Sequence, residues 1–169
     1  MALTALNNAE PLAPPLQQQL LDVARESIRR GLGGETTAVR ASDYPQALQV
    51  PRATFVTLHV NGALHGCIGT LEPRRPLVED VAGNAYGAAF QDFRFPALTL
   101  PEFDHLDIHI SILNPAEPMT FSSEENLIAQ LRPGIDGLIL EDGRHRGTFL
   151  PSVWDTVPKA RDFLRQLKL

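Results

Sequence analysis

The chain has 169 residues, of which 43% are apolar and 21% charged, and these totals are typical of one soluble globular domain. A formal net charge of -5 lacks the positive surplus that phosphate neutralisation requires, which excludes nucleic acid as the principal partner. The single cysteine excludes an internal disulfide, and no segment approaches the roughly 20 apolar residues of a membrane span. We therefore expect a cytoplasmic protein with no membrane partner.

The N-terminal residues 1–15 contain three of the chain's prolines within a short stretch. We predict a flexible lead-in there, which ends where proline is tolerated in the first turn of a helix. Residues 16–169 are expected to form a single domain. Its first helix runs to about Arg30, because apolar residues recur at offsets of three and four, and Gly31 supplies the stop.

A hairpin, a helix and a strand are predicted next. β-branched and aromatic residues at 53–60 indicate a strand, and the Asn61-Gly62 pair that follows is a strong hairpin signal because both residues accept positive φ. The second strand returns to about Thr70. A helix with an apolar stripe begins at Pro76, and apolar residues then alternate with polar ones at 106–112, which indicates a strand.

The last third of the chain repeats this pattern. A short helix is predicted at 122–131, a second hairpin around Asp142-Gly143, and a final helix from Pro158 whose Phe163, Leu164 and Leu167 pack inward. There is no internal repeat. The predicted class is α+β, with a mainly antiparallel sheet flanked by helices.

The stretch NGALHGCIGT contains the only cysteine, Cys67, and one of five histidines, His65. With a two-residue turn, Leu58 pairs with His65 and Val56 with Cys67, so His65 and Cys67 share a face of the sheet. Nucleophilic catalysis by Cys67 needs a thiol pKa lowered from about 8.5, for which His65 is the candidate base. The apolar neighbours instead favour a small buried hydrophobe, and both interpretations stay open.

Two glycines in this strand and two loops after it are candidates for ligand binding. Gly66 and Gly69 leave space for a ligand, or for close packing of a helix on the sheet. Arg74 in EPRRP and Arg94 in QDFRFP carry a planar guanidinium that fits a carboxylate or phosphate, and Asp92 in the second loop is a ligand-binding candidate with them. In the structural alternative, Arg94 pairs with Asp92 or Glu72 to hold its loop.

A metal site is considered at His105, Asp107 and His109, since two histidines and a carboxylate suit iron(II). On a strand, residues four apart lie roughly 13 Å from each other, so the three side chains cannot share one ion. No metal site is predicted, and a solvated strand face is the simpler interpretation.

Five motifs in one order resemble the AMMECR-one domain family from about Leu16 to Leu169, and in particular its bacterial members, the A protein of the AmmeMemoRadiSam system. These motifs are HGCIGT, PLVEDV, DFRFPALT, LDIHISIL and GIDGLILEDG with GTFLPSVW after it. The resemblance implies a compact α+β domain of two unequal lobes with a cleft beside the HGCIG strand. It supplies no proven catalytic residue and no cofactor, so none is predicted.

The resemblance also implies partners, because the family name records the company of a Memo-like protein and a radical S-adenosylmethionine enzyme. The positions carried over are Gly66, Cys67, Ile68 and Gly69 in the strand, and Asp92, Arg94, Phe95 and Pro96 in the loop. His65 departs from the arginine usual in the family. The chain also lacks the usual C-terminal tail, which would expose Leu167 and Leu169 and favours a homo-oligomer.

Two hypotheses follow for the function. In the first, the domain binds a small ligand or a protein partner at a cleft beside the strand from His65 to Gly69. In the second, it is an enzyme that uses Cys67 as nucleophile and His65 as base on a small anionic or carbonyl substrate. The sequence does not name the substrate.

Overall fold

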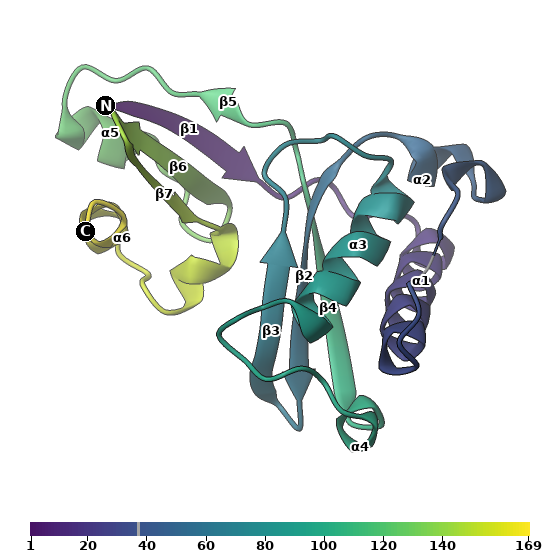
Figure 1. Ribbon diagram of the computed structural model, residues 1–169. Coiled ribbons are helices and arrows are strands. Elements are labelled where there is room, and N and C mark those ends of the chain that lie inside the picture. The colour runs from purple at the N-terminus through teal and green to yellow at the C-terminus, as the bar shows by residue number, and fades with distance from the viewer. Residues whose placement is uncertain (37) are drawn as a thin grey trace. The chain divides into compact units, whose positions relative to one another are not determined.

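The computed structural model describes residues 1–36 and 38–169. The chain forms two compact units, a small unit of Met1–Ala9 with Leu113–Leu169 and a large unit of Glu10–Ile112 (Figure 1). Each unit has its own sheet and its own cluster of buried apolar side chains. Helices accompany both sheets, and the predicted α+β class is confirmed. No described helix combines the length and apolar character that a membrane span requires.

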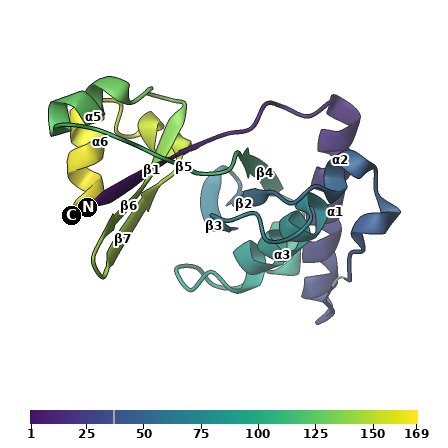
Figure 2. The ribbon, with the colours of Figure 1, turned by 90° about the horizontal axis from the view of Figure 1, so that it is seen from above.

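The large unit contains a three-stranded sheet in the order β3-β2-β4. Its elements are α1 (Pro14–Leu32), a 3-10 turn (Ala41–Asp43), α2 (Gln46–Gln49), β2 (Ala53–Val60), β3 (Ala63–Gly69), α3 (Leu77–Phe90), α4 (Leu100–Phe103) and β4 (Leu106–Leu113). Helix α3 packs on β2 and β3, and α1 lies beside α3 (Figures 1 and 2). Because β3 is the outermost strand in the order β3-β2-β4, it is an edge strand.

The helices of the large unit form where the sequence predicts them. In α3 the apolar stripe is almost fully buried against Val56 and Leu58 of β2. Helix α1 continues past the expected stop at Gly31 to Leu32, and the left-handed glycine is Gly34, with φ of 78°. Gly31 therefore lies inside the helix, where the Phe90 ring of α3 occupies the space that a side chain at this position would need.

The small unit is built on a four-stranded sheet in the order β5-β1-β6-β7. Its elements are β1 (Ala2–Asn7), β5 (Glu117–Pro118), α5 (Glu124–Gln130), β6 (Asp136–Asp142), β7 (His145–Phe149), a 3-10 turn (Pro151–Asp155) and α6 (Ala160–Leu167). In its core the Trp154 and Phe163 rings stack with centroids 3.9 Å apart. Leu167 is buried, as the pattern of the last helix predicts and in contrast to the exposure implied by the missing tail, whereas Leu169 is fully exposed.

The N-terminal lead-in predicted for residues 1–15 is wrong for its first half. Residues Ala2–Asn7 form β1, which pairs with both β5 and β6. Leu3 and Leu6 are 2% and 0% exposed, and Leu3 belongs to the buried apolar cluster of the small unit. The partner strands lie at the other end of the chain, so no local pattern indicates this pairing. The boundary after residue 15 therefore does not correspond to a boundary between the two units.

The predicted hairpin forms, but its register differs from the prediction. Asn61 and Gly62 both have positive φ, at 50° and 81°, as the turn requires. Beyond the pair of His59 with Leu64 the register shifts, so that Leu58 lies opposite Gly66 and Thr57 opposite Cys67. His65 is the extra residue of a β-bulge. The expected pairs of Leu58 with His65 and Val56 with Cys67 do not form.

Candidate functional site

The backbone of Cys67 faces outward from the edge of the sheet. Its N–H donates to Asp92 Oδ2 at 2.9 Å, and its carbonyl accepts from Arg94 Nη2 at 3.2 Å. An edge strand otherwise presents such groups to solvent or to another chain. The carboxylate and the guanidinium thus take the place of a neighbouring strand and attach the loop after α3 to β3.

Asp92 and Arg94 form the pair that holds this loop. Arg94 donates from Nε to Oδ1 at 2.9 Å and from Nη2 to Oδ2 at 2.7 Å, and its backbone N–H donates to Oδ1 at 3.2 Å. The Asp92 side chain is 2% exposed, whereas half of the Arg94 side chain is exposed. The structural alternative from the sequence, an arginine that pins its own loop, is present. A ligand-binding role for Asp92 and Arg94 remains a prediction.

The same contacts set the protonation of Asp92. The Arg94 guanidinium holds the pKa of the Asp92 carboxyl well below its usual range, and the backbone N–H groups of Cys67 and Arg94 act in the same direction against the effect of burial. In turn, Asp92 raises the pKa of Arg94. The pair is therefore charged at neutral pH.

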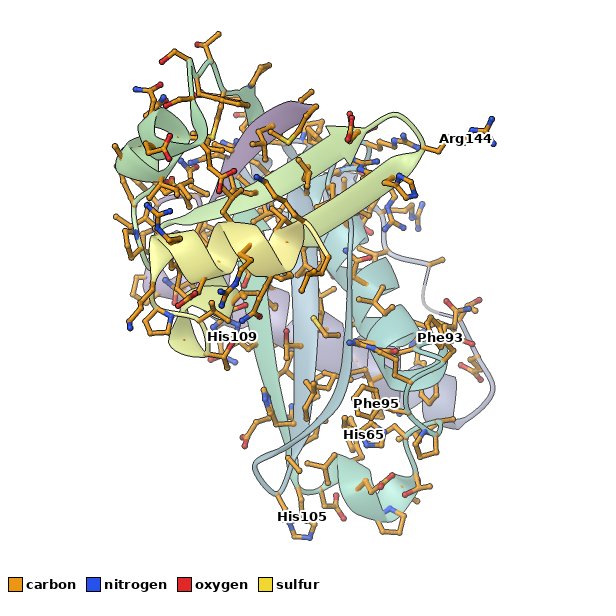
Figure 3. All side chains as sticks on the ribbon, turned by 90° about the vertical axis from the view of Figure 1, so that its left-hand side faces the viewer. His65, Phe93, Phe95, His105, His109 and Arg144 are labelled. Carbon is orange, nitrogen blue, oxygen red and sulfur yellow. The ribbon has the colours of Figure 1, made fainter. Side chains whose placement is uncertain are left out.

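The loop presents two aromatic side chains in different ways (Figure 3). Phe93, between the two paired residues, is 97% exposed. Phe95 turns back, with its ring 5.4 Å from the Arg94 guanidinium carbon and 6.2 Å from the His65 ring. The sequence analysis did not single out Phe93, because exposure depends on how the loop is held.

His65 and Cys67 are not brought together as predicted. The His65 ring is stacked against Phe95 and 8% exposed, and its Nε2 has no hydrogen-bond partner in the described part of the chain. Cys67 lies with Thr57, away from α3, with 3.2 Å between Sγ and Thr57 Oγ1. A nucleophile and its base need hydrogen-bond contact, and this pair does not have it.

Gly66 and Gly69 give space to the protein itself. A Cβ at Gly66 would overlap the backbone carbonyl of Ala88 in α3, and one at Gly69 would overlap the Phe55 ring. The space beside both glycines is therefore filled by the protein, as in the close-packing alternative, and not left for a ligand. A role of these two glycines in ligand binding remains a prediction.

Arg74 is separate from this group. It is exposed and donates to Glu72 from Nε at 3.0 Å and from Nη2 at 2.6 Å. Among residues 1–36 and 38–169, the Arg74 side chain forms no hydrogen bond with the Cys67 strand, and its predicted binding role remains a prediction. The neighbouring Arg75 instead donates from Nε and Nη2 to Asp80 Oδ1, at 3.1 and 2.9 Å.

Asp80 is the centre of a buried polar cluster that sequence reasoning missed. Its side chain is 1% exposed, and its Oδ2 accepts from the Thr54 N–H and hydroxyl, the Thr70 hydroxyl and the Asn84 amide, at 2.7 to 3.0 Å. A signal was present, because Asp80 and Asn84 are polar residues four apart within an otherwise apolar helix face.

The described residues contain no group of three His, Cys, Asp or Glu side chains placed to hold a metal ion. His105 and His109 lie at separate places along one edge of the large unit (Figure 3).

The comparisons agree with the resemblance seen in the sequence. The family model described as AMMECR1 matches residues 21–169. A protein from Methanothermobacter thermautotrophicus is 37% identical over 159 residues, which cover 91% of this chain and 81% of that protein. A protein from Thermotoga maritima is 41% identical over 128 residues, or 74% and 70% of the two chains. The crystal structure of protein PH0010 from Pyrococcus horikoshii has a TM-score of 0.81 at 34% identity, covering 88% and 76%. This chain therefore belongs to the AMMECR1 family.

Proposed function

We propose that this chain is a binding component that acts with a Memo-like protein and a radical S-adenosylmethionine enzyme. It docks a protein partner on the surface beside the strand from His65 to Gly69, through the loop at residues 91–96. The pathway rests on the family resemblance. The main support for this docking surface is that Phe93 is 97% exposed, although Asp92 and Arg94 on either side of it are hydrogen-bonded to the backbone of Cys67.

The loop has the properties of a preformed binding element. Asp92 and Arg94, on either side of Phe93, are hydrogen-bonded to each other and to the backbone of Cys67. The loop that holds Phe93 is therefore already restricted before a partner binds. Binding then costs less conformational entropy than it would for a flexible loop. Aromatic residues and arginine are also the types that contribute most binding energy at protein interfaces.

The enzyme hypothesis has weaker support from the geometry. Cys67 contacts the Thr57 hydroxyl, and His65 packs against Phe95 instead of the thiol. The proposed catalysis on a small anionic or carbonyl substrate would need another base. We expect Cys67→Ala to retain partner binding, because only the backbone of Cys67 contacts the loop.

The test is biolayer interferometry of the purified chain with the Memo-like protein and the radical enzyme of the same organism. We expect Phe93→Ala to raise the Kd at least tenfold, as is usual for an aromatic side chain that becomes buried in an interface. The matched control is Ile135→Ala, which truncates an exposed apolar side chain of the small unit, away from the loop. An unchanged Kd for Phe93→Ala, or no binding of either protein by the unmodified chain, would contradict the proposal.

The homo-oligomer expected from the sequence is a separate proposal. Sedimentation velocity of the chain alone tests it.

A further inference from the structure

The large unit contains a hollow between α1, the residues on either side of position 37, and α3. Its volume is about 480 Å³, within the range of small-molecule sites. The polar groups that line it include Ser27 of α1, Arg75, Glu79 and Tyr86 at or near α3, and Gln91. The exposed aromatic Phe93 is not among its lining residues.

Arg75 brings one free guanidinium nitrogen to this hollow. Its Nε and Nη2 are bonded to the buried Asp80, which fixes the plane of the guanidinium. Nη1 lies over Gly83, where a Cβ would be only 2.6 Å away, so the missing side chain gives it room. Within the described residues Nη1 has no hydrogen-bond acceptor. It is therefore available to donate to an acceptor atom of a ligand.

Glu79 brings an uncompensated negative charge. Its Oε1 accepts from the backbone N–H of Ala41 at 3.1 Å, and no basic side chain of residues 1–36 or 38–169 forms an ion pair with it. The positive charge of Arg75 is matched by Asp80. The hollow therefore favours a ligand that carries a cation toward Glu79.

The remaining walls suit a short aliphatic body. Ala82 and Val39 are apolar, and the Tyr86 ring is fixed against Phe90 with centroids 5.0 Å apart. An aromatic ring in the wall of the same hollow also favours an ammonium group.

The geometry points to a binding site for a small ω-amino acid, a zwitterion whose ammonium and carboxylate are separated by several methylenes. The ammonium binds Glu79, the carboxylate accepts from Arg75 Nη1, and the methylenes lie on Ala82 and Val39. The apolar part of the wall, formed by Ala82 and Val39, favours methylenes between the two charges over an α-amino acid.

The test is a titration of the isotope-labelled chain followed by NMR, with δ-aminovalerate as the probe. Valerate and pentylamine, which carry one charge each, serve as matched half-probes. We expect the backbone amide signals of Gly83 and Tyr86 to shift, and each half-probe to bind at least tenfold more weakly than the zwitterion. No shift with δ-aminovalerate, or equal affinity for pentylamine, would overturn the site.

Variants locate the two charges. Glu79→Gln removes the ammonium partner, and Arg75→Lys removes Nη1 while it keeps a cation beside Asp80. Each is expected to raise the Kd for δ-aminovalerate at least tenfold. Glu125→Gln, the same change at an exposed residue of α5, is expected to leave the Kd unchanged. If Arg75→Lys loses the dispersed spectrum of a folded chain, Glu79→Gln decides, and an unchanged Kd for that variant overturns the proposal.

Discussion

Asp92 is the residue on which the edge of β3 depends most. Its carboxylate accepts the Cys67 N–H and three donors of Arg94 while it is almost fully buried. Asp92→Asn removes the charge, and one amide oxygen cannot accept all these bonds. We expect the free energy of unfolding to fall by about 1–3 kcal/mol, measured by urea denaturation near neutral pH. Asp107→Asn, at an exposed position of β4, is the control and should have little effect.

The effect of Asp92→Asn should depend on pH. The pKa of Asp92 is lowered in the folded chain by Arg94 and two backbone N–H groups. A group of this kind stabilises the fold fully above its unfolded pKa of about 3.9, and the contribution is lost as the pH falls toward the folded value. The difference in unfolding free energy between the unmodified chain and Asp92→Asn should therefore shrink below about pH 4. A constant difference across this range would contradict the charge pair as its source.

At this scale the sequence allowed some contacts to be predicted but not the exposure of side chains. The pairing of Arg94 with Asp92 could be anticipated, because the residues are two apart and oppositely charged. Phe93 and Asp80 were missed, because the exposure of one and the burial of the other are set by residues distant in the sequence.

At the scale of elements, the bulge at His65 determines which side chains of β3 face α3. A regular register would place His65 opposite Leu58 on that face and Gly66 on the other. The bulge instead brings Gly66 opposite Leu58, against the backbone of Ala88. Asn61-Gly62 indicates the turn, but the extra residue depends on helix packing and has no local signal. The predicted pairing of His65 with Cys67 failed for this reason.

Gly66→Ala tests this packing. The added Cβ would overlap the backbone carbonyl of Ala88, which cannot move as a flexible side chain can. We expect the free energy of unfolding to fall by about 3 kcal/mol, measured by urea denaturation. In Gly33→Ala the nearest atom is the Arg30 carbonyl oxygen at 3.3 Å, and φ is -86°, so this control should change stability much less. Equal effects would mean that the contact of β3 with α3 can relax.

At the scale of the whole molecule, the α+β class and the family could be predicted from local patterns and ordered motifs. The resemblance also implied two unequal lobes, but not which segments form each unit, because the small unit combines the first nine residues with the last third of the chain. Strand β1 pairs with strands near the other terminus, and only the folded chain brings them together. Periodicity within short windows does not report such pairing.

The two units also offer separate optical probes of unfolding. The only tryptophan, Trp154, is buried in the core of the small unit, and that cluster also contains Leu3. The helices α1 and α3, with 19 and 14 residues, lie in the large unit and dominate the far-ultraviolet circular dichroism. Tryptophan fluorescence therefore reports on one unit and circular dichroism mainly on the other.

Leu3→Ala uses these probes to test the role of the N-terminal strand. The substitution leaves a cavity beside β6 and should lower the free energy of unfolding of the small unit by about 2–5 kcal/mol. Because each unit has its own core, we expect the fluorescence transition in urea to move to lower concentration while the circular dichroism transition stays in place. Leu58→Ala, at a fully buried position of β2, should produce the reverse pattern. If both transitions move together in both variants, the two units unfold as one cooperative structure.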